Sequence, residues 1–144
     1  KFNTKFILSG RKINDSMYNY VVRKFKSKLP NKNNKILIVG LTFKENVPDT
    51  RNSQSILIAK KLSKLNYYTF IFDPLVNLKV KNCKSINSFT ELDKFQNFFD
   101  GILILVSHKK IISKGYNYFN NLAKKKGIFF DIKNTFDKNT DFKL

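Results

Sequence analysis

Lys35-Ile36-Leu37-Ile38-Val39-Gly40 is a short aliphatic run closed by glycine, and it decides the fold class of this chain. A continuous apolar run, unlike an alternation of apolar and polar residues, predicts a strand that is buried on both faces of a sheet. Similar runs at 68–72, 101–106 and 126–131 predict three more strands. The run at 68–72 is stopped by Asp73-Pro74, and a short strand is expected within the ambiguous segment 75–88, at 78–83.

Helical patterns alternate with these strands. Residues 11–29 carry apolar side chains at spacings of three and four, and Pro30 ends that helix. A second helix is expected from about Ser53, capped by Asn52 or Ser53, and further helices at 90–98 and 116–126. The tail at 132–144 is polar and weakly specified.

Alternating strands and helices predict βαβ units with right-handed crossovers. The expected fold is therefore α/β, a Rossmann-like, doubly wound parallel sheet preceded by a helix. Ligands of such folds bind at the carboxyl ends of the strands. That rule directs attention to the loops that begin at Gly40, Asp73, Val106 and Asp131.

Length and composition exclude several classes of protein. The 144 residues suit one domain or one domain with an appendage, and 42% apolar residues argue against whole-chain disorder. The sequence has no apolar run that approaches the ~20 residues of a membrane span, and the apolar part of its first residues is too short for a signal-peptide core. The single cysteine, Cys83, excludes an internal disulfide and a thiolate metal site. Because the chain begins with Lys1, we expect its true beginning to be missing.

The net charge of +18 raises the question of a nucleic-acid partner. Only Arg11, Arg23 and Arg51 are arginine, the usual residue for bidentate recognition of bases and phosphates. The lysines are spread along the whole chain, and their company of Asn, Ile and Phe is typical of a nucleotide-composition bias. Binding of a polyanion by a basic Rossmann-like module remains the alternative function.

The loop after the first strand runs from Gly40 to Ser53 and lacks the second and third glycines of a dinucleotide fingerprint. The loop instead carries the cations of Lys44 and Arg51 beside the start of a helix, an arrangement that favours the binding of an anion. The alternative is that both are solvated loop charges.

The stretch Ile36-Leu-Ile-Val-Gly-Leu-Thr-Phe-Lys-Glu-Asn-Val-Pro-Asp-Thr-Arg-Asn-Ser53 resembles the opening of the C-terminal domain of the UDP-glucose/GDP-mannose dehydrogenase family. Phe72-Asp-Pro74, Val106-Ser-His108 and Phe130-Asp-Ile-Lys133 agree with it in order and spacing. Gly10-Arg-Lys-Ile-Asn-Asp-Ser-Met17 resembles the end of the long helix that joins the family's two domains. The version found here is most similar to the branch that acts on UDP-N-acetylhexosamines in surface-polysaccharide synthesis.

This resemblance implies a UDP-sugar 6-dehydrogenase that uses NAD and a cysteine-linked intermediate. It implies that Phe43, Lys44 and Lys133 bind the substrate and that Arg51 reaches NAD in the facing domain. Lys133 departs from the arginine found at this position in many members, so a single point charge replaces a bidentate clamp. It further implies that 1–30 ends a connecting and dimerisation helix and that 31–144 is the nucleotide-sugar-binding domain.

Several family parts lie upstream of these residues, namely the NAD fingerprint and the nucleophilic cysteine segment. We therefore expect NAD to be bound mainly by a missing N-terminal domain, and we expect the 144 residues alone to be inactive, with no catalytic residue and no metal. Cys83 is interpreted as a structural or incidental thiol, and Asp73 as a strand terminator. His108 has no nearby acid-base partner in the sequence and is interpreted as a loop or helix-start residue. The expected partners are a UDP-sugar, that N-terminal domain and a second copy bound through the helix, but neither nucleic acid nor a membrane. The expected location is the cytoplasm.

A third possible function is that of an interaction domain that keeps the fold but has lost its ligand. The intact Phe43-Lys44 and Asp49-Thr-Arg51 strings argue against this function.

Overall fold

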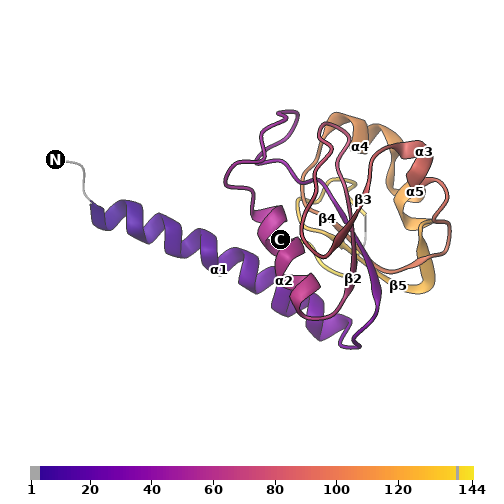
Figure 1. Ribbon diagram of the computed structural model, residues 1–144, viewed down its shortest axis with the longest axis horizontal. Coiled ribbons are helices and arrows are strands. Elements are labelled where there is room, and N and C mark those ends of the chain that lie inside the picture. Colours follow the sequence, from indigo (N-terminus) through magenta and orange to yellow (C-terminus); the bar gives the residue numbers. More distant parts are fainter. Residues whose placement is uncertain (1–3, 139) are drawn as a thin grey trace.

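A five-stranded parallel sheet forms the centre of the protein (Figure 1). The computed structural model describes residues 4–138 and 140–144, with side chains at 12–13 and from 16 onward. The elements in chain order are α1 (Thr4–Lys28), β1 (Lys35–Val39), α2 (Gln54–Lys64), β2 (Tyr68–Phe72), β3 (Cys83–Ile86), α3 (Phe89–Leu92), β4 (Phe99–Ile104), α4 (Lys109–Lys114), α5 (Tyr116–Asn120) and β5 (Ala123–Asp131). The strand order β3-β2-β1-β4-β5 is that of a Rossmann-like sheet, which confirms the predicted fold class.

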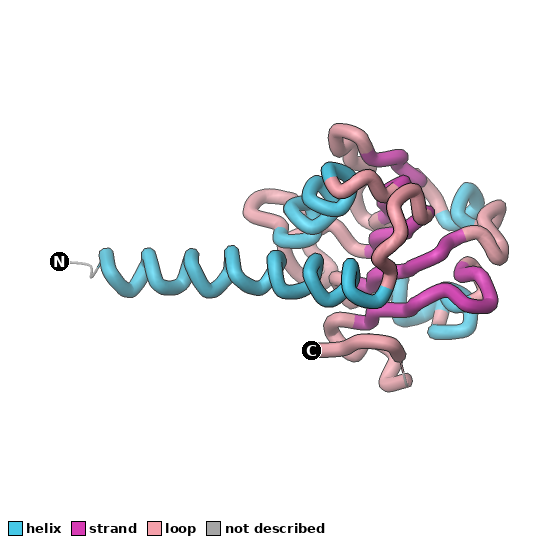
Figure 2. Tube along the Cα trace, turned by 90° about the horizontal axis from the view of Figure 1, so that it is seen from below, coloured by secondary structure: helices cyan, strands magenta, loops and turns pink. Residues whose placement is uncertain are grey.

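Helices cover both faces of the sheet, as the apolar strands require (Figure 2). Ile36 and Ile38 of β1 point into a core shared with α1 and α2, whereas Leu37 and Val39 point into the core beneath α3, α4 and α5. Each strand therefore contributes to two separate cores, and the sheet is held in one orientation between them.

Helix α1 differs from the other helices because only its end packs on the sheet (Figures 1 and 2). Phe25 is fully buried, with its ring edge-on to Phe130 at 5.1 Å between centroids, while Ile13 is 63% exposed. The helical spacing of Ile13, Met17, Val21 and Phe25 predicts one exposed apolar stripe that packs against another domain or a second subunit. For Val21 and Phe25 that expectation is wrong, since both are buried within this domain. Ile13 and Met17 alone keep the exposed character that was expected of that stripe.

The strands β1 and β2 lie where the sequence predicts them, whereas later segments differ. β3 occupies Cys83–Ile86 and not 78–83, and the helix expected at 90–98 is only one turn, Phe89–Leu92. The helix expected at 116–126 ends at Asn120, because residues from Ala123 onward pair with β4 as part of β5. The tail expected to be weakly specified follows the outer edge of β5, where Phe142 forms an isolated bridge with Phe130.

Candidate functional site

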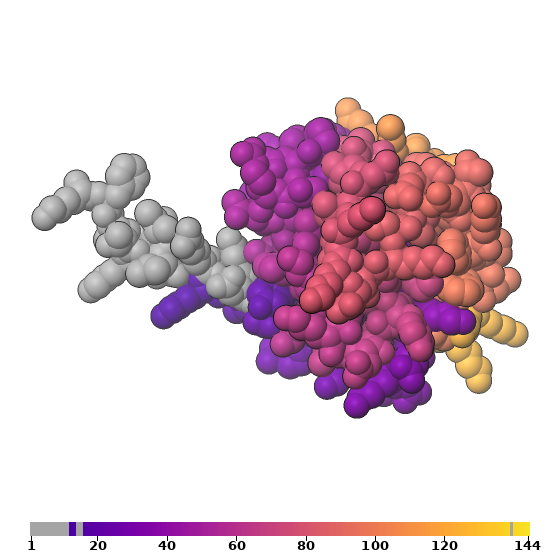
Figure 3. Space-filling view, viewed as in Figure 1, coloured from indigo at the N-terminus to yellow at the C-terminus, as the bar shows by residue number. Residues whose placement is uncertain are grey.

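The carboxyl ends of the strands bring together the loop 40–53, the segment 73–75, the start of α4 and the segment 131–136. The loop 40–53 lies on the outer surface of the molecule, where it is seen in purple at the upper left of the folded domain in Figure 3. This arrangement places Phe43, Lys44, Arg51 and Lys133 at the edge of the sheet where ligands of this fold bind.

Two contacts fix the ends of the loop. Gly40 has φ of +89°, and a Cβ there would lie 2.7 Å from Val106 Cβ, so the chain passes the segment that follows β4 at a distance that only glycine permits. At the other end, the Ser53 hydroxyl donates to the Leu41 carbonyl at 2.7 Å and caps α2 by accepting from the Ile56 N–H. Ser53 is thus the cap, as one of the two predicted choices.

Between these ends, the loop presents Phe43 and Lys44 to solvent. The Phe43 side chain is 59% exposed, although its backbone N–H donates to the Asp49 carbonyl at 2.7 Å. The Lys44 carbonyl accepts from the buried Thr42 hydroxyl at 2.9 Å, so the backbone is fixed while the ammonium stays exposed. The side chains thereby remain available to a ligand on a backbone that is already ordered.

Lys133 approaches the same loop from the end of β5. Its Nζ lies 3.8 Å from Glu45 Oε1, with both side chains partly exposed. The buried Asp131 carboxylate positions the turn by accepting the backbone N–H groups of Thr135 and Phe136 at 2.8 and 3.0 Å. The structure therefore brings Lys133 beside the residue that follows Lys44, although 89 positions separate the two lysines in the sequence.

Arg51 forms a bidentate pair with Asp49 in the same loop. Arg51 Nε and Nη2 donate to the two Asp49 oxygens at 3.0 and 2.9 Å. These hydrogen bonds lower the pKa of Asp49 to about 2 and raise the pKa of Arg51. Because the Arg51 side chain is 86% exposed, it remains open to a partner from outside this domain.

His108 and Asp73 form a buried pair that the sequence did not predict. His108 Nε2 lies 2.9 Å from Asp73 Oδ2, and both side chains are fully buried. His108 also precedes α4, as predicted, and Asp73 ends the second strand, as predicted. His108 has no acid-base partner nearby in the sequence, because its partner lies 35 residues away and meets it only where the strand ends converge. The one available signal was that both residues follow strands of a parallel sheet.

Cys83 lies far from these groups, because it is the first residue of β3 and so lies at the amino ends of the strands, opposite the candidate site. Burial raises the pKa of its thiol, and its Sγ donates to the Ala59 carbonyl at 3.8 Å. A thiol of this kind is poorly suited to act as a nucleophile.

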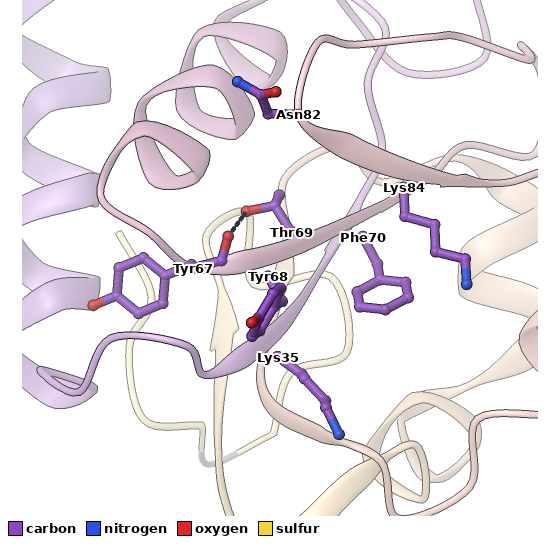
Figure 4. A pocket seen from close by; sticks show the side chains of 7 residues that line it. All are labelled: Lys35, Tyr67, Tyr68, Thr69, Phe70, Asn82 and Lys84. Carbon is purple, nitrogen blue, oxygen red and sulfur yellow. Dashed lines mark hydrogen bonds between the residues drawn. The ribbon is translucent and has the colours of Figure 1, made fainter.

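The same opposite edge carries a hollow of about 290 Å³. Figure 4 shows the Lys35 and Lys84 side chains on either side of the Phe70 ring, with Tyr68 beside it. Within the described side chains no group of three or more His, Cys, Asp or Glu is placed to hold a metal ion. No helix in the described part of the chain has the length and apolar character needed to cross a membrane.

Comparisons with known proteins agree with this geometry. Residues 37–138 match the model of the UDP-glucose/GDP-mannose dehydrogenase family, UDP binding domain. The chain is 33% identical over 135 residues to the UDP-N-acetyl-D-glucosamine 6-dehydrogenase of Salmonella typhi, covering 90% of this chain and 31% of that protein. The corresponding enzyme of Pseudomonas aeruginosa is 29% identical over 150 residues, covering 99% of this chain and 35% of the enzyme.

A solved structure agrees as well. The native UDP-N-acetyl-mannosamine dehydrogenase Cap5O from Staphylococcus aureus superposes with a TM-score of 0.71 at 29% identity, covering 99% of this chain and 33% of that one. The chain thus spans about a third of the length of the relatives it matches.

Proposed function

The chain belongs to the UDP-glucose/GDP-mannose dehydrogenase family, and on that premise we propose that its sheet domain binds the UDP part of a UDP-sugar. The match of residues 37–138 to the family's UDP binding domain carries this proposal. The carboxyl edge of the sheet is the proposed site, since the loop 40–53 and Lys133 meet there.

We propose that Lys44 and Lys133 neutralise the charge of the diphosphate. Both ammonium groups are exposed and belong to segments whose backbones are fixed by hydrogen bonds, so little order must be gained on binding. Glu45, 3.8 Å from Lys133, would hold that lysine near the loop until an anion binds. The exposed ring of Phe43 supplies a flat apolar face for the sugar nucleotide.

The residues of this domain do not fit the pyrophosphate of NAD. After β1 the chain takes the long loop from Leu41 to Ser53 before α2 begins, and Gly40 is the only glycine there. The short glycine-rich turn onto a helix N-terminus that cradles a dinucleotide is therefore missing from this position. We propose that Arg51, 86% exposed, is this domain's one contact with NAD held elsewhere.

For the whole protein we propose the oxidation of the C6 alcohol of a UDP-N-acetylhexosamine to a carboxylate, with NAD as hydride acceptor, for surface-polysaccharide synthesis in the cytoplasm. Relatives named for UDP-N-acetylglucosamine and UDP-N-acetylmannosamine support this substrate class. The 144 residues alone are proposed to be inactive, because Cys83 is half-buried at the wrong edge of the sheet. NADH formation by these residues with a UDP-sugar would contradict this.

We further propose that residues 1–30 serve as a connecting and dimerisation helix and 31–144 as the binding domain. The exposed Ile13 and Met17 of α1 support a partner for its outer part, either the facing NAD-binding domain or a second copy. The buried residues of its last turns show that the helix is also anchored in the binding domain.

The test is binding of UDP measured by isothermal titration calorimetry. We expect Lys44→Ala and Lys133→Ala each to weaken UDP binding about tenfold, which corresponds to the loss of about 1.4 kcal/mol. Lys125→Ala is the matched control, because it removes the same charge from an exposed residue in the first half of β5, away from the site.

The same variants distinguish the polyanion alternative. Single-stranded RNA held by dispersed lysines would bind with a steep salt dependence, and all three variants would affect it about equally. RNA binding of that kind, with no measurable binding of UDP, would replace the dehydrogenase proposal.

A further inference from the structure

We propose that His108 is a positioning residue that fastens the loop 40–53 in the conformation that presents Phe43 and Lys44. The ligand-binding part of this inference rests on the proposed function, whereas the fastening of the loop rests on the geometry alone. His108 is fully buried and does not face solvent, so its role is exerted through the residues that it contacts.

Both ring nitrogens of His108 are used, and each faces a different segment. Nδ1 accepts the backbone N–H of Asn46 at 2.9 Å, in the middle of the loop. Nε2 lies 2.9 Å from Asp73 Oδ2 at the end of β2 and 3.1 Å from the Thr42 hydroxyl near the start of the loop. One imidazole therefore connects the ends of two strands to the loop between β1 and α2.

The contacts assign the tautomer. Because Nδ1 accepts a backbone N–H, the ring proton lies on Nε2, from which it is donated to Asp73 and shared with Thr42. Asp73 is held in turn by the N–H groups of Leu41 and Leu75, at 2.7 and 2.8 Å. The carboxylate thus fixes the orientation of the ring, and the ring presents a lone pair to the loop.

Asn46 completes the attachment from the loop side. Its side-chain oxygen accepts the backbone N–H of Lys109 at 2.8 Å, so Asn46 contacts two consecutive residues at the start of α4. Its φ of +63° lies in the left-handed region that Asn and Gly tolerate. Because Asn46 is exposed, this attachment can be altered without opening the core.

The attachment matters for the site because Asn46 directly follows Lys44 and Glu45. Glu45 is the loop residue that contacts Lys133, at 3.8 Å. If Asn46 were released, the loop beyond Lys44 would lose its attachment to the start of α4, and Glu45 would lose its position beside Lys133. An apolar side chain of similar volume at position 108 would fill the same space without holding the loop.

Three variants separate fastening from packing. Asn46→Gly keeps the backbone N–H and suits the positive φ but removes the bond to Lys109. His108→Gln places an amide donor near the Nε2 position and retains the contact with Asp73, but it offers no acceptor to Asn46. His108→Asn does the reverse, because its amide oxygen lies near the Nδ1 position and accepts the Asn46 N–H.

The measurements are amide hydrogen exchange of the loop 40–53, with strand β1 as internal control, and the affinity for UDP. We expect Asn46→Gly and His108→Gln to speed exchange of the loop amides at least tenfold and to weaken UDP binding about fivefold. His108→Asn is expected to retain loop protection and UDP affinity within twofold, and exchange in β1 is expected to remain slow.

Each of the other outcomes contradicts one part of the proposal. Unchanged loop exchange in His108→Gln overturns fastening by His108, and so does a loss of loop protection in His108→Asn as large as in His108→Gln. Asn46→Gly keeps the N–H that Nδ1 accepts, so unchanged exchange in this variant overturns the part of the attachment that the Asn46 side chain makes with Lys109. A faster-exchanging loop with unchanged UDP affinity overturns the positioning role. If the unaltered protein does not bind UDP, the proposed function is wrong, while the exchange data still test the fastening.

Discussion

Gly40 is the residue at which the candidate site meets the sheet, and its replacement isolates a steric effect. Gly40→Ala would place a Cβ 2.7 Å from both Cβ and N of Val106 at a φ of +89°. Gly115→Ala is the matched control, because its φ of +83° is similar while nothing lies within 4 Å. We expect urea unfolding to show a loss of about 1 kcal/mol for Gly115→Ala and about 3 kcal/mol or more for Gly40→Ala. Equal losses would show that β4 can move aside.

Asp73 gives the protein a dependence on pH whose sign follows from its contacts. Burial acts to raise the pKa of Asp73, but hydrogen bonds from His108 and from the N–H groups of Leu41 and Leu75 outweigh burial and hold the pKa below its ordinary value of 3.8. Because the folded protein holds this proton less tightly than the unfolded chain, the stabilisation is complete above pH 3.8 and is lost as the pH falls through the folded pKa.

Asp73→Asn should therefore lower the free energy of unfolding at pH 7, by about 1–3 kcal/mol, and flatten its decline in acid. The measurement is urea unfolding between pH 7 and pH 2, with Asp49→Asn as control. Asp49 also has a lowered pKa, but its partner Arg51 is exposed, so salt should screen that contribution and leave the contribution of Asp73 intact. An acid decline in Asp73→Asn as steep as in the unaltered protein would exclude Asp73 as its source.

Sequence patterns predict where single residues of this site lie better than they predict which contacts those residues make. Lys44 and Lys133 could be assigned to one edge because each follows a strand of a parallel sheet. The bond between His108 and Asp73 could not be predicted, because the two residues are 35 positions apart and their contact depends on the conformations of the two loops that carry them. The salt bridge of Lys133 with Glu45 likewise depends on the loop's internal hydrogen bonds, which no spacing reveals.

At the scale of elements, the Phe25 ring is one of the buried groups that hold α1 on the sheet. A Cβ on Gly101 of β4 would lie 2.7 Å from Phe25 Cζ, so the absent side chain of the glycine makes room for that ring. We expect Phe25→Ala to lower the free energy of unfolding by about 3–5 kcal/mol, since the ring is fully buried. Ile13→Ala, on the exposed part of the same helix, should change it by less than about 0.5 kcal/mol when measured on the monomer. Urea unfolding of both variants tests this, and a small effect of Phe25→Ala would mean that the helix can detach without unfolding the sheet.

The element that sequence patterns misjudge, β5, shows where periodicity fails. Tyr116 and Phe119 have helical spacing, and a helix continuing through the lysines at 124–126 would have a solvated face. In the structure those lysines belong to the outermost named strand, where exposed side chains are tolerated. The pairing also shifts register, from Phe99 with Ala123 to Gly101 with Ile128, which accommodates the charged run. Edge pairing of this kind is decided by the neighbouring strand and not by the segment's own pattern.

For the whole molecule, we expect the projecting part of α1 to contact a partner surface (Figure 1). Ile13 and Met17 lie one helical turn apart and are 63% and 41% exposed, and a helical segment without tertiary contacts is only marginally stable in water. A second copy of the chain would cover both side chains through a symmetric helix pair.

We therefore expect sedimentation equilibrium to show self-association that Ile13→Glu and Met17→Glu each weaken at least tenfold, since each buries a charge in the contact. Lys12→Gln is the control, because it lies on the same exposed segment and lowers the net charge by the same amount as Ile13→Glu. A protein that remains monomeric, with all variants alike, would exclude the second copy and leave the NAD-binding domain as the surface that α1 contacts. Association weakened equally by Lys12→Gln would instead attribute it to charge, and the apolar pair would then have no part in holding two copies together.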